Sequence, residues 1–549
     1  MHADARETRI QAILDRLDRL TALGTALSAE RDTERLTERI LLGAKELTHA
    51  DGGTLYLLND DEDALVFHTV RNDSLGLAMG GTTGEPVTLG PLPLRLADGA
   101  PNHRNVAAHA ALTGRTVTIR DAYTAEGFDF SGTRAFDEQT GYRSESFLTI
   151  PLINHEDAVI GVLQLLNACE PEGGQVVGFT DEDRRLGESL ASQAAVALTK
   201  QQLITEQREL FEAFIRVLAK AVDEKSKHTS GHCQRVPELT LLIADAANRT
   251  QQGPLAEFAF SEDERYELEI AGWLHDCGKV TTPESVMEKE TKLHGLHDRM
   301  AEVATRFEVI KRDTEIQALH ERLAAAEAGR PPAEWATEAA VVTTQAVLDE
   351  ECAFLGQANI GGEFMSAEAQ ERVRAIGEGR RWRGPDGREQ PVLSEEEIGH
   401  LAIAKGTLTA EEREVMKNHM QVTIDMLEAL PYPEHLQRVP RLAGGHHERM
   451  DGYGYPRGLV GTENPIGGRM MAIADVFEAL TAADRPYKTP KPLSEALTIM
   501  GRMCQDGHFD PDVFDLFIRE RVYLDYARRF LRPEQIDAVD EAALLGYVP

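Results

Sequence analysis

The sequence has no uninterrupted apolar run of roughly 18 residues, and its N-terminus, MHADARETRIQ, lacks the apolar core of a signal peptide. It is also poor in basic residues, with 58 Lys and Arg against 92 Asp and Glu and a net charge of −34. Most of such a surface would repel a polyanion, which argues against a nucleic-acid polymer as partner. We expect a soluble protein without membrane insertion, and any anionic substrate should be small.

Cysteine is scarce as well. The five cysteines are odd in number, are widely scattered and form no CxxC pair, which is typical of a reducing compartment. We therefore expect a cytoplasmic location. At 549 residues the chain is too long for one hydrophobic core, so two or three domains are expected.

Residues 1–182 have the pattern of an α/β domain. Apolar residues recur at helical spacing up to about residue 47, and short β-like runs follow, such as TLYLL, FLTIPLI and VIGVLQLL. Gly, Asp and Asn turns separate these runs. The pattern predicts a sheet with flanking helices.

Residues 183–225 form the next predicted element, a long connecting helix. Its apolar residues repeat every seven positions, at Val196, Leu203, Leu210 and Val217, and beside them at Ala197, Ile204, Phe211 and Leu218. A repeat of this length suggests a helix that pairs with its copy in a homodimer. The alternative, an amphipathic helix buried against its own domain, fits the pattern equally well.

The rest of the chain, from 224 to 510, is mainly helical by pattern. Residues from about 284 to 405 differ, because they contain charged helical repeats, a Gly-rich piece and the polar loop GRRWRGPDGREQP. We interpret this segment as an insertion between two parts of one site, long enough to form a small helical subdomain.

Histidines and aspartates carry the chemical signal in this half. The candidates lie in apolar or Gly-rich settings: His232, His275, Asp276, His419, His446, His447 and Asp475. Imidazole and carboxylate ligands suit borderline divalent metals, and one carboxylate can bridge two ions. The pair His297-Asp298 lacks such a setting and is interpreted as a surface pair, whereas His275-Asp276 ends an apolar helical stretch.

Several residues near these candidates suit a phosphate substrate. Lys279 follows His275 by four residues, so one helical turn would place its ammonium beside the pair. Arg485 and Lys488, in DRPYK, could clamp another phosphate oxygen. Tyr455, in GYGYP, is positioned to stack or donate a hydrogen bond. We predict His275, Asp276 and Lys279 as catalytic residues, and Lys279, Tyr455, Arg485 and Lys488 as substrate contacts.

Together, HTSGHCQRV, HDCGK, His419, HHERMDGYGYP, AIADVFEAL and DRPYK resemble the HD-GYP family of the HD phosphohydrolases. The resemblance covers roughly residues 211–530 apart from the insertion. It implies an all-α domain that hydrolyses cyclic di-GMP to the linear dinucleotide or GMP, with the seven His and Asp candidates as metal ligands. It also implies two or three divalent ions, Fe or Mn first and Ni or Zn as alternatives.

The number of metals depends on residue 228. Some family members hold a third ion through a carboxylate four residues before the first histidine, and here that position is His228. His228 could replace the carboxylate, or it could be a surface histidine.

The N-terminal region resembles a GAF domain, a small-molecule sensor with an antiparallel sheet, in its strand order and in LLNACEPEGGQVVGFTDEDRR. The resemblance implies an unidentified small-molecule ligand. Cyclic-nucleotide-binding GAF domains carry an Asn-Lys pair where this chain has Asn167-Ala168.

The resemblance to a regulated phosphodiesterase leaves two alternatives. The enzyme could act on another cyclic dinucleotide or nucleotide, because none of the ligands reads a base. The chain could also be a non-catalytic nucleotide-binding receptor.

Overall fold

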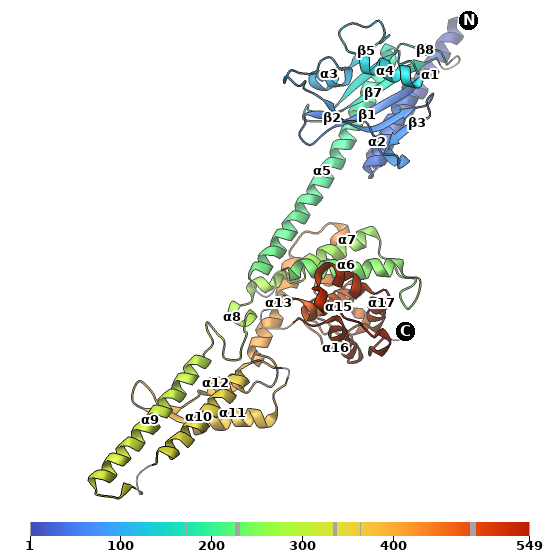
Figure 1. The fold of residues 1–549 in the computed structure, drawn as a ribbon. Helices are drawn as coiled ribbons and strands as arrows, with labels where there is room; N and C mark the ends of the chain where they lie inside the picture. The colour runs from blue at the N-terminus through green and yellow to red at the C-terminus, as the bar shows by residue number, and fades with distance from the viewer. Residues whose placement is uncertain are drawn as a thin grey trace. The chain divides into compact units, whose positions relative to one another are not determined.

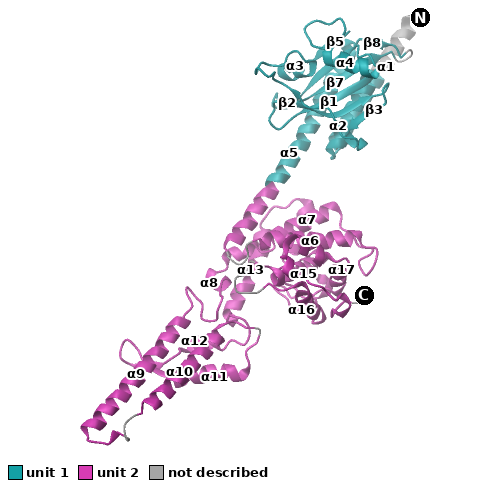
Figure 2. Ribbon diagram, viewed as in Figure 1, with its two compact units in different colours: residues 1–210 teal, residues 211–549 magenta. Residues whose placement is uncertain are grey.

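The computed structural model describes residues 2–170, 174–225, 231–332, 337–362, 364–483 and 490–547, with side chains from residue 14 onward. The chain divides into two compact units, residues 1–210 and 211–549 (Figure 2). In the described part of the chain, no helix is long and apolar enough to cross a bilayer.

Unit 1 is built around an antiparallel sheet (Figure 1). Its elements, in chain order, are α1 (His2–Ala29), α2 (Thr33–Thr48), β1 (Ala50–Leu58), β2 (Ala64–Asn72), β3 (Leu77–Gly80), η1 (Gly81–Thr83), β4 (Leu92–Pro93), α3 (Val106–Thr113), β5 (Val117–Ile119), α4 (Ser131–Thr140), β6 (Phe147–Ile153), β7 (Val159–Cys169) and β8 (Val176–Val177). The main strand order is β3-β2-β1-β7-β6-β5, with β4 beside β2 and β8 beside β7.

Helices cover both faces of this sheet because successive strand residues point to opposite sides. Leu163 and Leu165 of β7 pack with α1, α2 and the start of the next helix, α5. Val162 lies on the other face, with the alanines of α3. The predicted fold of this region, an antiparallel sheet with flanking helices, is confirmed.

Helix α5 (Asp181–Lys225) is the long connecting helix. The four residues of the predicted heptad stripe are 53–64% exposed: Val196, Leu203, Leu210 and Val217. Phe214 lies in phase with them and is also exposed, whereas Ile215 packs into the core of unit 2. The stripe therefore is not buried against the described part of this chain.

Unit 2 is mainly helical, as predicted. Its main elements are α6 (His232–Arg249), α7 (Glu262–Leu274), η2 (Cys277–Thr281), α8 (Glu284–Met287), α13 (Ala410–Glu428), η4 (Glu434–Leu436), α14 (Val439–Ala443), η5 (Gly461–Glu463), α15 (Ile466–Thr481), α16 (Leu493–Gln505), α17 (Pro511–Arg519), α18 (Val522–Phe530), η6 (Pro533–Gln535) and η7 (Glu541–Ala543). One hydrophobic core joins α6, α7, α14, α15, α16, α17 and α18.

A subdomain between α8 and α13 has a core of its own. Its elements are α9 (Met300–Glu327), α10 (Glu338–Asn359), α11 (Ala367–Gly379), β9 (Arg381–Arg383), β10 (Glu389–Pro391) and α12 (Glu395–Leu401). Phe307, Leu355 and Val373 lie in this core. The segment interpreted above as a polar loop is in fact a β-hairpin, because a turn at 384–388 lets β9 and β10 pair.

The two chain segments that connect the subdomain to the main helical body contact each other. The Lys289 ammonium lies 2.7 and 2.8 Å from the two carboxylate oxygens of Glu412 on α13. Thr407 donates to the Lys289 carbonyl at 2.9 Å. These contacts join residues that are more than a hundred positions apart in the sequence. The two ends of the subdomain therefore lie close together, and α13 can pack beside η2.

Candidate metal centre

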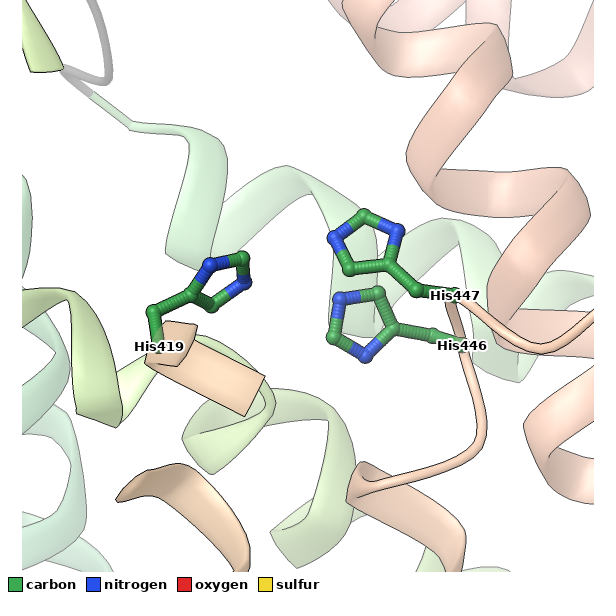
Figure 3. Close-up of side chains that lie close together, drawn as sticks. All are labelled: His419, His446 and His447. Atoms are coloured by element: carbon green, nitrogen blue, oxygen red, sulfur yellow. The ribbon is translucent and has the colours of Figure 1, made fainter. Parts of the chain in front are cut away.

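All seven predicted ligands lie in unit 2, on segments that the fold brings together: His232 on α6, His275 and Asp276 at the end of α7, His419 on α13, His446 and His447 after α14, and Asp475 on α15. Six of them form two groups whose donor atoms lie within 4.8 Å of one another. The first group is His232, His275 and Asp276, and the second is His419, His446 and His447. Figure 3 shows the second group, with His446 and His447 facing His419 across the site.

Asp276 lies between the two groups. Its Oδ2 atom is 3.4 Å from His232 Nε2 and 3.3 Å from His275 Nε2. Its Oδ1 atom is 3.4 Å from His419 Nε2 and 4.0 Å from His446 Nε2. One carboxylate oxygen thus faces each group, so Asp276 would be shared by metal ions bound at the two groups.

Three histidines share one hydrogen-bonding pattern. The Nδ1 atoms of His275, His419 and His446 lie 2.7, 2.5 and 2.8 Å from the backbone carbonyl oxygen three residues earlier. A carbonyl only accepts, so each Nδ1 carries the proton and each Nε2 keeps its lone pair. The three Nε2 atoms are buried without a hydrogen-bond partner, as is Asp276 Oδ1.

Unpartnered polar atoms are rare in protein interiors because desolvation is costly, and here four lie in one cluster around Asp276. A metal-ligating histidine characteristically donates its other ring nitrogen to a carbonyl or carboxylate. The donor set therefore fits divalent metal ions.

Glu478 is a component of the site that the sequence analysis did not identify. It is fully buried on α15, and its Oε2 atom lies 2.6 Å from His232 Nδ1. Its other oxygen accepts from Arg235 Nε at 2.8 Å. Glu478 therefore orients the His232 ring as the carbonyls orient the other three. Its position one helical turn after Asp475, on the same face of α15, was the available signal.

The charges of the site favour the ligand forms of Asp276, His446 and His447. His232 differs, because burial lowers its pKa but Glu478, Asp276 and Asp475 outweigh burial and hold that pKa well above its usual value. Burial raises the pKa of Asp276, but Lys279 and His275 outweigh it and hold that pKa well below the ordinary value. Burial raises the pKa of Glu478 too, yet His232 and Arg235 bring it to about 2. Burial lowers the pKa of His447 to about 4 and that of His446 well below its usual range. At neutral pH these carboxylates are charged and these two imidazoles are neutral.

Lys279 and Tyr455 border the cluster. The Lys279 ammonium lies 2.5 Å from Asp276 Oδ2, because η2 brings residues three apart together. The predicted proximity to the His-Asp pair is thus present, with Asp276 as the direct partner. The Tyr455 ring stacks on His447, with centroids 4.7 Å apart.

Three predicted residues, His228, Arg485 and Lys488, lie outside the described residues. The pair His297-Asp298 is separate from the cluster. His297 pairs with Glu302 at the surface, and Asp298 accepts hydrogen bonds from Thr291 and Asn359 in the subdomain.

Close backbone packing fixes the position of the His275-Asp276 turn. Gly278 donates from its backbone to Thr423 Oγ1 at 2.9 Å. A Cβ at this position would lie 2.1 Å from the His419 carbonyl oxygen, so glycine is required for the approach of η2 to α13. The first and second groups of ligands are held together here.

Comparisons with known proteins agree with this geometry. Residues 395–513 match the HD domain family, and residues 30–199 match the GAF domain family. The chain contains a GAF domain and an HD domain. The HD match includes His419, His446, His447 and Asp475. It begins after His232, His275 and Asp276, which precede the subdomain in the sequence and which the fold brings beside the matched residues.

Curated relatives resemble parts of the chain. A cyclic di-GMP phosphodiesterase of Thermotoga maritima is 40% identical over 134 residues, which cover 24% of this chain and 34% of the relative. A cyclic di-GMP phosphodiesterase response regulator of Xanthomonas campestris is 38% identical over 25% of this chain and 40% of its own length. A 3'3'-cGAMP-specific phosphodiesterase of Vibrio cholerae is 51% identical over 14% of this chain and 18% of its own. The chain thus spans well under half the length of each relative.

We predict that Glu478→Gln weakens metal binding selectively. The neutral amide removes the charge that orients and polarises His232, and losses of such partners cost about 10- to 100-fold in metal affinity. Competition with a chelator should show weaker binding of one ion and unchanged binding of the other. Glu257→Gln, at an exposed glutamate, is the control; equal affinities in the Glu478 variant and the wild type would contradict the assignment.

A pH prediction follows from His447. Its pKa of about 4 in the folded protein lies below the unfolded value of about 6.5, so between these values the unfolded chain binds a proton that the folded site does not. The metal-free protein should therefore lose stability as pH falls from about 6.5 to 4, by up to about 3 kcal/mol from this residue. Urea unfolding across this range should show a shallower dependence for His447→Ala; an identical slope would refute the assignment.

Proposed function

We propose that the HD-containing unit is a metal-dependent phosphodiesterase that hydrolyses cyclic di-GMP to the linear dinucleotide or GMP, under control of the GAF domain. The observation that carries this proposal is that three unpartnered imidazole nitrogens and an unpartnered carboxylate oxygen gather around Asp276. The names of the relatives from Thermotoga and Xanthomonas support the substrate class.

Two divalent ions are proposed, one for each histidine group, with Asp276 shared between them and Asp475 completing the first group. Asp475 Oδ1 lies 3.2 Å from His232 Nε2, which places it on that side. When bound, two such ions would supply a nucleophile at neutral pH and would neutralise charge on a phosphate attacked in line. Fe or Mn is the preferred choice for this mixed imidazole and carboxylate set, with Ni or Zn as alternatives, and His228 is the candidate for a third ion.

The remaining residues are proposed to bind the substrate. The Lys279 ammonium contacts Asp276, and 19% of its side chain is exposed. Its charge is therefore available to a phosphate oxygen beside the metals. Tyr455 presents a half-buried ring that His447 and the short loop before Pro456 hold in place. A ring so held can stack on a nucleobase.

A second cyclic dinucleotide is a specific alternative substrate. Three relatives from Vibrio cholerae are named 3'3'-cGAMP-specific phosphodiesterases and are 51%, 35% and 38% identical over the aligned segments. Because none of the metal ligands contacts a base, the cluster itself would serve either compound.

We further propose that α5 forms a parallel coiled coil in a homodimer. In the dimer, the α5 helix of the second copy would cover four exposed residues at heptad positions: Val196, Leu203, Leu210 and Val217. A strict seven-residue repeat presents the same face to an identical helix, and burial of such residues drives association. The GAF domain would bind an unidentified small molecule, and α5 would carry the response to the HD domain.

The central test is an activity assay with both candidate substrates. Purified protein supplied with Mn²⁺ under anaerobic conditions should linearise cyclic di-GMP, and Asp276→Ala should lower turnover by at least about a thousandfold, because both metals lose a shared ligand. Product analysis by chromatography separates linear dinucleotide from GMP. Preferential cleavage of 3'3'-cGAMP would select the alternative substrate, and binding without turnover would favour a receptor.

The homodimer is tested by placing charge in the stripe. Leu210→Glu with Val217→Glu should convert a dimer into a monomer, because each interface would bury four like charges. Sedimentation equilibrium gives the molar mass directly. Thr205→Glu, on the opposite side of α5, is the control; a wild-type monomer, or a dimer that survives both substitutions in the stripe, would refute the coiled coil.

A further inference from the structure

The last turn of α5 contacts both segments that carry the first group of ligands. α6 begins with His232, and η2 begins directly after Asp276. Two side chains of α5, Asp223 and Lys225, reach these two segments with opposite charges. Both contacts lie within unit 2.

Asp223 holds the N-terminus of α6. It is buried, and its two carboxylate oxygens accept from the backbone N–H groups of Gly231 at 3.1 Å and Cys233 at 3.3 Å. The N-cap residue Gly231 has no side chain for this task. The first N–H groups of a helix lack intrahelical partners and carry partial positive charge, so a carboxylate stabilises them. The two bonds flank His232 and fix its backbone.

Lys225 holds the other segment. Its ammonium donates to the backbone carbonyls of Lys279 at 3.3 Å and Thr282 at 2.7 Å, and to that of Val280 between them. Carbonyls at the C-terminal end of a helical turn are the counterpart of the free N–H groups, and a cation stabilises them. Because η2 is a short turn that starts after Asp276, fixing its far end also fixes the direction in which Asp276 leaves α7.

We propose that Asp223 and Lys225 are positioning residues for the metal centre, which together set the separation of His232 from His275 and Asp276. This inference rests on the proposed function and deepens it, because it names the physical link between α5 and the site. The helix is continuous from residue 181 to 225. A rotation or shift of its last turn would therefore reach both segments of the first group through two side chains, and would reach the second group only through Asp276.

Binding of Mn²⁺ to the full-length protein tests the proposal without reference to turnover. The variants are Lys225→Met and Asp223→Asn, with Lys220→Met and Glu224→Gln as matched controls at exposed positions of the same helix. The wild type should bind two ions per chain. In each test variant the ion at the first group should bind about 10- to 100-fold more weakly, as for other losses of supporting contacts, and the second ion, which shares only Asp276 with that group, should weaken much less.

Two further measurements separate positioning from general stability. Lys225→Arg keeps a cation that can donate to the same carbonyls, so it should restore most of the lost affinity. Absorption spectra of Co²⁺ at one and two equivalents should differ from the wild type more strongly at the first group's site than at the second in Lys225→Met. Equal weakening of both ions, or equal weakening in Lys220→Met, would overturn the proposal.

The outcomes also distinguish this inference from the proposed function. If the wild type binds two ions and both test variants bind them with the same affinities, the positioning role is wrong and the metal centre stands. A wild type that binds no Mn²⁺ would overturn the metal centre and this inference with it. If Asp223→Asn does not fold, Lys225→Met and its arginine rescue still decide the question.

Discussion

The buried carboxylate of Asp276 is the constraint on which the helical unit depends. Only 2% of this residue is exposed, and an ionised carboxylate in such a place is strongly unfavourable without compensation. Lys279 and His232 compensate one oxygen, whereas the other faces imidazole nitrogens that lack partners. Such a cluster lowers the stability of the folded chain. Bound metal ions would offset this cost, because they would coordinate the unpartnered atoms and balance the buried charge.

Much of the unit serves to hold that cluster in shape. Backbone carbonyls orient three histidines, and Glu478 orients the fourth. The glycine at 278 lets η2 approach α13 closely enough for the two groups to share one aspartate. The supporting contacts are therefore as specific as the ligands, which is expected where metal geometry must be set before the ion binds.

The subdomain shows how a long insertion can be accommodated. Its core is separate from the main helical core, and the ion pair between Lys289 and Glu412 closes its base. The insertion therefore adds structure between Asp276 and His419 in the sequence without separating them in space.

The sequence by itself indicated the seven candidate ligands, the segment interpreted as an insertion, the long helix and the two fold classes, because periodicity and residue type are local properties. It left open whether the stripe on α5 is buried, and it did not identify Glu478, Asp223 or Lys225. Glu478 and Lys225 contact segments distant in the sequence, α6 and η2, whereas Asp223 contacts the nearby start of α6. Single charged residues in helices carry no distinguishing pattern. Only the tertiary structure decided which imidazole nitrogens remain free and which oxygen of Asp276 faces each group, because those properties depend on packing between helices rather than on sequence order.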